Sequence, residues 1–204
     1  MTKAAQIANA TVTGTVNSVD ISGGATGLTF SGSPITNSGT ITMAGNLAVT
    51  SGGTGLNKKP PFMMVYANTA ATATYVSGGL SPYVTVKFNT IVVDTETAFN
   101  TTANSYTPKT PGYYRVTVYV LETAIATGAY TIVLLLSKNG ARYMVTEELI
   151  NYTAGYVQTM HLTTIISMNG TTDTLTVSIA TNSGSITYGT GLDTRMTAEW
   201  IGPL

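Results

Sequence analysis

Residues 111–123 read PGYYRVTVYVLET, and this stretch decides the fold class. From Tyr114 to Val120 every second side chain is aromatic or aliphatic, which is the period of a half-buried β-strand. The Pro-Gly pair in front of it, together with Pro108, interrupts regular structure before the strand begins. The stretch therefore predicts a long strand over residues 113–123.

The same alternation recurs through the rest of the chain after residue 61, and no window has a helical period. It predicts strands at about 62–67, 73–76, 83–93, 113–123, 129–137, 142–149, 157–168, 173–181 and 194–201. Asn139-Gly140 and Asn169-Gly170 each predict a hairpin turn between two of these strands. Eight or nine closely spaced strands predict an all-β domain, built as an antiparallel sandwich or jelly roll over residues 62–204.

Composition and charge exclude several functional classes. The 204 residues hold nine basic and nine acidic side chains, so no basic field exists for nucleic acid. No apolar run approaches eighteen residues, which predicts no membrane insertion. Cysteine is absent, which excludes disulfides and zinc–thiolate sites. Since only 9% of residues are charged, we expect the chain to be part of a larger assembly.

Residues 1–57 have a different composition. They carry only two charges, Lys3 and Asp20, and about half of the 21 glycines. Short alternating runs such as 11–16, 18–21 and 40–43 lie between Gly-rich turns and are too short to form a core of their own. They predict an extended arm of short strands that covers its apolar side on partner chains; a flexible linker is the alternative. Asn57-Lys58-Lys59-Pro60-Pro61 ends any strand and marks the boundary.

The run Tyr130–Leu136 (YTIVLLL) is apolar on both faces of a predicted strand. A strand of a lone sandwich normally alternates, so its outer face is predicted to be buried as well. Either another subunit or a loop of the same chain could cover it. We favour the subunit, which makes Tyr130, Ile132, Leu134 and Leu136 the predicted interface residues.

Two parts of the chain resemble known families. Residues 16–55, VNSVDISGGATGLTFSGSPITNSGTITMAGNLAVTSGGTG, are similar to a Gly/Thr-rich segment of phage tail-fibre and other virion structural proteins. The second half resembles the globular head of complement C1q and the TNF-like jelly roll. The segments that carry this likeness are VKFNTIVVDTETAFN (86–100), YTPKTPGYYRVTVYV (106–120), the KNG turn at 138–140 and the closing AEWIGPL.

The C1q/TNF resemblance implies a ten-stranded, two-sheet jelly roll that assembles as a homotrimer about a three-fold axis. Heads of this kind pack aromatic and aliphatic side chains around that axis, which suits Tyr130–Leu136. Some also hold calcium through loop carboxylates, but Asp94, Glu96, Asp173 and Asp193 do not cluster here as such a cation requires. Each is predicted to form a salt bridge or to cap a turn instead.

The sequence offers no constellation for catalysis. The one histidine, His161, lies in an apolar run without a motif around it. Glu147 and Glu148 are adjacent and so point to opposite faces of a strand. Asp94 and Glu96 share a face, but at a Thr-rich strand end that is typical of a solvated rim. We therefore expect no enzyme, no catalytic residue, no metal and no cofactor.

Tyrosines near predicted strand ends could grip a host surface glycan or protein, because an exposed Tyr offers a flat apolar ring and a hydrogen-bonding hydroxyl. The predicted receptor contacts are Tyr152, Tyr156 and Tyr188. Packing within the sandwich is the alternative for any one of them.

Together these features favour a non-enzymatic phage virion structural protein. We expect a trimeric fibre or knob on the virion surface, anchored to other virion proteins through residues 1–57 and attaching to the host. Since MTKAAQIANA shows no secretory signal, assembly in the host cytoplasm is expected. The alternative is a capsid cement (decoration) protein. A secreted lectin or adhesin, or a tailspike-type glycanase, ranks lower.

Overall fold

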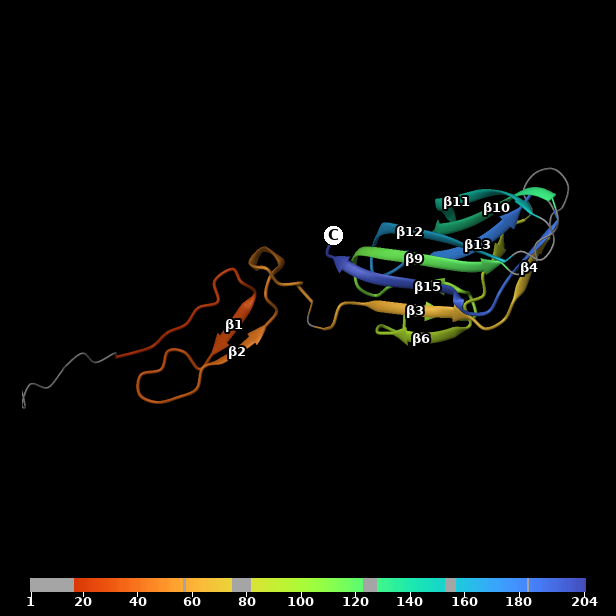
Figure 1. The fold of residues 1–204 in the computed structure, drawn as a ribbon. Helices are drawn as coiled ribbons and strands as arrows, with labels where there is room; N and C mark the ends of the chain where they lie inside the picture. Colours follow the sequence, from red (N-terminus) through yellow and green to blue (C-terminus); the bar gives the residue numbers. More distant parts are fainter. Residues whose placement is uncertain (1–16, 57, 75–81, 123–127, 153–156, 183) are drawn as a thin grey trace, which may run out of the picture. The chain divides into compact units, whose positions relative to one another are not determined.

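The computed structural model describes residues 17–56, 58–74, 82–122, 128–152, 157–182 and 184–204, without the side chains of 128–130 and 150–152. The chain divides into two compact units, Met1–Asn57 and Lys58–Leu204, which are described separately below. Figure 1 shows the strands of both units. No helix in the described part is long and apolar enough to span a membrane.

The N-terminal unit is a small ribbon without a core. Strands β1 (Leu28–Ser31) and β2 (Thr42–Gly45) pair antiparallel, and a single 3-10 turn, η1, follows at Val49–Ser51. Of the predicted runs, 40–43 overlaps β2, 18–21 gives only the bridge between Val19 and Ile35, and 11–16 lies outside the described residues. None of the side chains of 17–56 is buried.

Deleting residues 1–57 is therefore expected to leave the remaining domain folded. The reason is that the described side chains of this segment bury nothing, while residues 58–204 hold every buried residue of the described core. Thermal melting of the full chain and of residues 58–204 should give midpoints within a few degrees of each other. Loss of the cooperative transition in the shortened chain would show that the arm is part of the fold.

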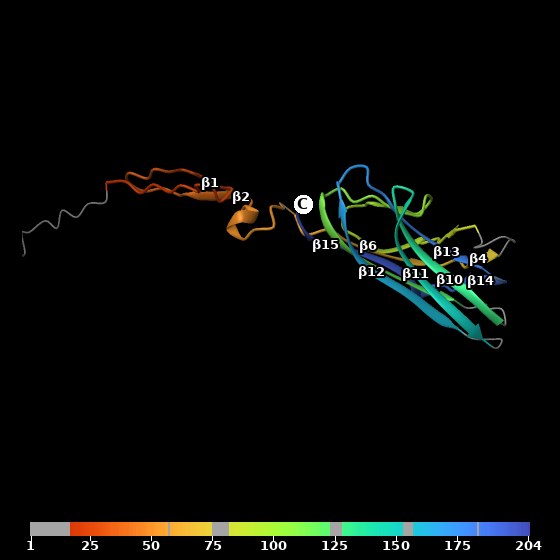
Figure 2. The same cartoon turned by 90° about the horizontal axis from the view of Figure 1, so that it is seen from above.

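The C-terminal unit is a sandwich of two antiparallel sheets, so the predicted fold class is confirmed. One sheet has the order β11-β10-β13-β8-β7, with β5 also on β13; the other has the order β4-β14-β9-β15-β3-β6, with β12 on β9. Figure 2 shows the two sheets from above. The strands are β3 Phe62–Ala67, β4 Ala71–Thr74, β5 Val84–Thr85, β6 Thr90–Asp94, β7 Phe99–Asn100, β8 Ser105–Tyr106, β9 Gly112–Glu122, β10 Gly128–Lys138, β11 Ala141–Tyr152, β12 Gln158–Met168, β13 Leu175–Thr181, β14 Ser185–Tyr188 and β15 Gly191–Gly202.

One of the two predicted hairpins is confirmed and the other is wrong. Asn139 and Gly140 have φ of 54° and 78° and join β10 to β11 with Lys138 opposite Ala141, as a two-residue hairpin requires. Asn169-Gly170 instead begins a crossing from β12 to β13, which lie in different sheets. The Asn169 side-chain oxygen accepts the backbone N–H groups of residues 171, 172 and 173, each at 3.0 Å, and so folds the loop locally.

The core lies between the sheets, on the even-numbered face of β9. Tyr114, Val116, Val118 and Val120 have no exposed surface. The facing sheet contributes Ile132, Leu134, Leu136, Leu175 and Ile179, all equally inaccessible. The alternation in the sequence therefore marks the buried side of the central strand correctly.

Acidic side chains at one end of the sandwich are used for structure, as predicted for Asp94, Glu96 and Asp173. Asp94 accepts backbone N–H groups of Glu96, Ala98 and Phe99 at 2.7–3.2 Å. Asp173 lies 2.9 Å from the Lys138 ammonium and accepts a hydrogen bond from the Asn139 side-chain amide, the largest of the effects that lower its pKa. These carboxylates hold turns in place.

Glu96 provides a test of this role. Its side chain is almost fully buried, 2.5 Å from the Lys58 ammonium, and accepts hydrogen bonds from the Thr110 hydroxyl and the Lys109 N–H. Burial alone would raise its pKa, but these hydrogen bonds and the charge of Lys58 lower it below the ordinary value of 4.5. Because the folded-state pKa is depressed, the stabilisation is present above pH 4.5 and is lost as the pH falls through the lower folded-state value.

The Glu96→Gln variant is expected to unfold more easily by about 1–3 kcal/mol at pH 7, the cost of a lost charge-assisted hydrogen bond. Its stability should also depend less on pH below 4.5 than that of the wild type. Urea denaturation at pH 3.5, 5 and 7 measures both effects. Equal stability of variant and wild type at pH 7 would contradict a stabilising role for the ion pair and hydrogen bonds of Glu96.

Candidate functional site: the outer face of the β12-β9-β15-β3 sheet

The odd-numbered side chains of β9 point away from the core, onto a face that no described strand of the C-terminal unit covers. Tyr113 is 45% exposed, Arg115 is exposed, and Thr117 and Tyr119 are partly exposed. The neighbouring strands β12, β15 and β3 add their outward side chains in register with these. We call this surface the outer face.

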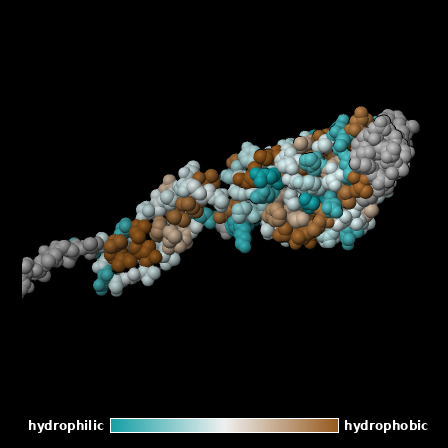
Figure 3. Space-filling model, in the orientation of Figure 1, coloured by the Kyte–Doolittle hydropathy of each residue, from teal (hydrophilic) through white to brown (hydrophobic). Residues whose placement is uncertain are grey.

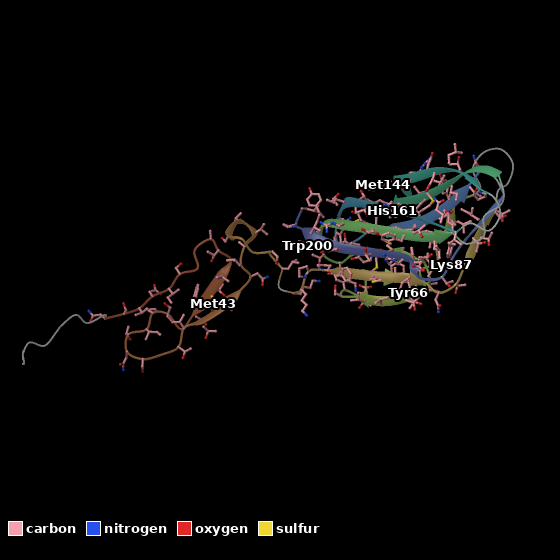
Figure 4. The ribbon with its side chains drawn as sticks, viewed as in Figure 1. Met43, Tyr66, Lys87, Met144, His161 and Trp200 are labelled. Atoms are coloured by element: carbon pink, nitrogen blue, oxygen red, sulfur yellow. The ribbon has the colours of Figure 1, made fainter. Side chains whose placement is uncertain are left out.

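One row of the outer face combines aromatic rings with a cation. Tyr66 of β3, Arg195 of β15, Tyr119 of β9 and His161 of β12 are successive cross-strand neighbours. The Arg195 guanidinium lies 4.2 Å from the centre of the Tyr119 ring, and the His161 ring stacks on the same ring at 5.9 Å and 21°. Figure 4 shows His161 and Tyr66 on either side of the β9–β15 pair.

Of the next two rows of the outer face, the first has no charged side chain and the second has both charged and apolar ones. Met64, Thr197, Thr117 and Thr163 form a row without charge, in which the Thr163 hydroxyl is 3.1 Å from that of Thr117. The row after it pairs Phe62, Glu199, Arg115 and Ile165, with Arg115 and Glu199 in a 3.3 Å ion pair. Since that pair is half exposed, it contributes little to folding stability.

Apolar side chains on the outer face remain in water. Phe62 is 36% exposed, Ile165 52% and Ile201 39%. Figure 3 shows brown apolar residues over β3 and β6 and near β12, among white and teal polar ones. Exposed apolar and aromatic side chains on one sheet face, in a chain with so little charge, are typical of a protein–protein contact.

A second apolar surface follows the adjoining edges of β11 and β12, which have no backbone ladder between them. The edges are linked by the Tyr143 hydroxyl, which donates to the Ile165 carbonyl at 3.1 Å, and by the Thr146 hydroxyl on the His161 carbonyl at 3.4 Å. Leu149 is 78% exposed on this edge, and Val157, next to the start of β12, is 52% exposed. We call this surface the β11/β12 edge.

The structure corrects the predicted subunit contact on β10. Ile132, Leu134 and Leu136 have no exposed surface in the single chain, so they have no surface left to bury against a second chain. Val133 and Leu135 on the other face of the strand are buried too. The side chain of Tyr130 lies outside the described residues. The both-sides-apolar pattern therefore indicates burial within one chain, the alternative that we considered weaker.

The structure also corrects one of the three predicted receptor contacts. Tyr188 has no exposed surface, and its hydroxyl accepts the Lys87 N–H at 2.8 Å inside the sandwich. Burial raises its pKa. The side chains of Tyr152 and Tyr156 lie outside the described residues, so their role stays a prediction.

Chemistry-bearing side chains do not gather into a reactive group in the described part of the chain. No three His, Cys, Asp or Glu residues there come together as metal ligands. The His161 ring stacks on Tyr119, and the Glu147 carboxylate lies 3.8 Å from the Arg142 guanidinium.

One acidic residue was not identified from the sequence: Glu122 is fully buried at the end of β9. The alternation of β9 places it on the core side, which was the signal that could have found it.

Solved structures share this architecture. A TNF from S. frugiperda, Eiger, aligns with a TM-score of 0.50 at 9% identity over 72% of this chain and 96% of its own. At that identity the likeness shows the fold alone. The fold is a TNF-like jelly roll. The globular domain of zebrafish complement 1qA (TM-score 0.49, 13% identity, 72% of this chain and 100% of its own) and murine APRIL (TM-score 0.49, 11% identity, 70% and 100%) are also similar.

Comparisons of sequence found no relatives. No protein-family model matches the chain, and no curated protein does. The TNF-like jelly roll is therefore assigned from architecture: two antiparallel sheets, the strand order given above and a core between them.

Proposed function

We propose that the chain is a non-enzymatic virion surface protein whose TNF-like jelly roll forms a homotrimer through the outer face. The observation that carries the trimer is the uncovered apolar and aromatic surface of β12, β9, β15 and β3. A protein with zero net charge and such a surface gains by burying it against further copies.

A ring of three identical chains needs two different complementary surfaces on each chain, since a contact of a surface with itself closes at two copies. The outer face and the β11/β12 edge provide two such surfaces. We therefore propose that the edge of one chain, with Leu149 and Val157, packs on the outer face of the next. The neutral row of Met64, Thr117, Thr163 and Thr197 would then lie against apolar side chains without stranding a charge.

The virion role is supported by the resemblance of residues 16–55 to virion structural segments. The N-terminal unit also suits an anchor, because Val19, Ile21, Met43, Leu47 and Val49 are 39–63% exposed and can be covered by a partner. In this proposal residues 1–57 attach the knob to the particle, and three knobs together contact the host surface. Three weak contacts on one trimer add up to useful avidity.

Purification of particles tests this role. We expect the chain to co-sediment with virions through a density gradient, and the form lacking residues 1–57 to stay in the soluble fraction. Gel densitometry then separates the two structural roles: a fibre is present in far fewer copies than the major capsid protein, whereas a cement protein approaches its number. A full-length chain found only in the soluble fraction would contradict the virion proposal.

A further inference from the structure

Glu122 ends β9 on the side of the strand that faces the second sheet. In register it lies opposite Gln158 of β12 and Tyr188 of β14, and it continues the buried row of Val118 and Val120. Its side chain has no exposed surface. A carboxyl group thus occupies a position that the strand pattern assigns to an apolar residue.

Neither carboxyl oxygen of Glu122 has a hydrogen-bond partner in the described structure. A buried, unpaired carboxylate is strongly disfavoured because it has lost its water without gaining donors or a cation. The protonated acid carries no net charge and is tolerated far better in the same place. The geometry therefore selects the neutral form of the side chain.

The groups around Glu122 strengthen this selection. The negative charge of Glu148 on β11 disfavours a second negative charge on Glu122. The Gln158 side-chain amide donates a hydrogen bond to Glu148. Tyr188 of β14 is a buried phenol whose hydroxyl already accepts a hydrogen bond. On β15, the Arg195 guanidinium lies over the Tyr119 ring on the outer face.

Lys87, whose backbone N–H meets the Tyr188 hydroxyl, is an exposed residue, and its charge is not among the effects that act on Glu122. β10 and β13 present the uncharged side chains of Ile132 and Thr181 at this end. The ion pair of Glu147 with Arg142 lies on exposed side chains of β11. No described cation therefore compensates an ionised Glu122.

We propose that Glu122 is a proton-operated latch: as a neutral acid it lets the two sheets close on each other, and loss of its proton opens this end of the sandwich to water. Burial, and then the charge of Glu148, raise the pKa of Glu122 to about 8. At pH 7 roughly one molecule in ten would then carry the ionised form. The latch therefore works close to neutral pH and within a single chain, whatever the chain assembles with.

The direction of the pH effect follows from linkage. The folded-state pKa lies above the unfolded value, so the stabilising contribution is complete below pH 4.5 and is lost as the pH rises through about 8. Across this window the folded state holds one proton more than the unfolded state. The unfolding equilibrium constant should therefore rise by up to tenfold per pH unit from this group.

The experiment combines carboxyl-carbon NMR with denaturation of the full-length chain. The Glu122 carboxyl resonance is assigned as the signal missing in Glu122→Gln and is titrated from pH 4 to 10. Urea unfolding, followed by the fluorescence of the one tryptophan, Trp200, compares wild type, Glu122→Gln and Glu148→Gln at pH 5, 7 and 9. Glu148 is exposed, so its replacement tests the latch even if the Glu122 variant folds poorly.

We expect a midpoint near pH 8 for Glu122, a lower midpoint in Glu148→Gln, and a wild-type loss of stability between pH 5 and 9 that Glu122→Gln lacks. A Glu122 resonance that titrates near pH 4.5 would overturn the proposal, because the group would then be hydrated or paired. A pH dependence of unfolding that is identical in wild type and Glu122→Gln would overturn it as well.

Discussion

Replacing Ile165 by lysine is expected to convert the proposed trimer into folded monomers. Ile165 is 52% exposed in the single chain, so a lysine there can extend into water without disturbing the fold. In the proposed trimer the same position lies where the outer face meets the β11/β12 edge, and three ammonium groups would be buried without partners. Burial of an unpaired charge costs several kcal/mol per site, so we expect at least a hundredfold weaker association.

Sedimentation velocity at micromolar concentration, together with far-UV circular dichroism, measures this result. Ile165→Thr is the control without charge: its side chain is β-branched but smaller and more polar than that of isoleucine, and the variant should remain trimeric. If Ile165→Lys sediments like the wild type, Ile165 lies outside the interface. If both variants dissociate, the contact depends on packing of the isoleucine rather than on exclusion of charge.

Leu134→Ala is expected to give the largest loss of folding stability, about 2–5 kcal/mol, the range for a leucine removed from a closed core. Leu134 is at the centre of β10, and its side chain has no exposed surface. Its neighbours in register are Thr146 of β11 and Ile179 of β13. For a domain of this size, at about 2–4 °C per kcal/mol, such a loss lowers Tm by about 4–20 °C.

The same variant tests whether the apolar run Tyr130–Leu136 is buried within its own chain or against a second chain. Thermal melting of residues 58–204 should show the full destabilisation at every protein concentration if Leu134 is a core residue. Leu134→Met, which keeps the volume, should cost less than about 1.5 kcal/mol. A loss that disappears on dilution to the monomer would place Leu134 in the interface after all.

Strands such as β3 and β9 could be predicted because each exposes one face and buries the other. Phe62–Ala67 was predicted to the residue, since Met63, Val65 and Ala67 are buried and the residues between them are not. The predicted strand 83–93 breaks into β5 and β6. Strands β7, β8 and β14 have two to four residues, which is too short for any period to show.

The positions of individual side chains were less predictable, because a pattern gives a strand's faces but not what covers them. Tyr130–Leu136 reads as buried on both sides, yet nothing in the run tells whether its own chain or another covers it. Tyr188 lies near a strand end, where a tyrosine is often exposed, but β14 carries it into the core beside Ile186. Glu122 was missed for the same reason. The alternation of β9 predicts that its side chain faces the core, but its lack of hydrogen-bond partners depends on several neighbouring strands.

For the outer face, the sequence predicts which side chains of one strand share a side, but not which strands lie next to each other. Tyr113, Thr117 and Tyr119 alternate with the core residues of β9, so the sequence places them on one side of a strand. Only the pairing of β9 with β12 and β15 brings His161 and Arg195 onto the two sides of the Tyr119 ring. A surface assembled from four strands could not be recognised from any one of them.

Sedimentation equilibrium of the full chain and of residues 58–204 tests the trimeric jelly roll directly. We predict a mass three times that of the 21.2 kDa chain, and a threefold mass for the shortened form as well. A single-chain mass for both proteins at tens of micromolar, with circular dichroism showing a folded β domain, would contradict it. The outer face would then be a surface for a different partner.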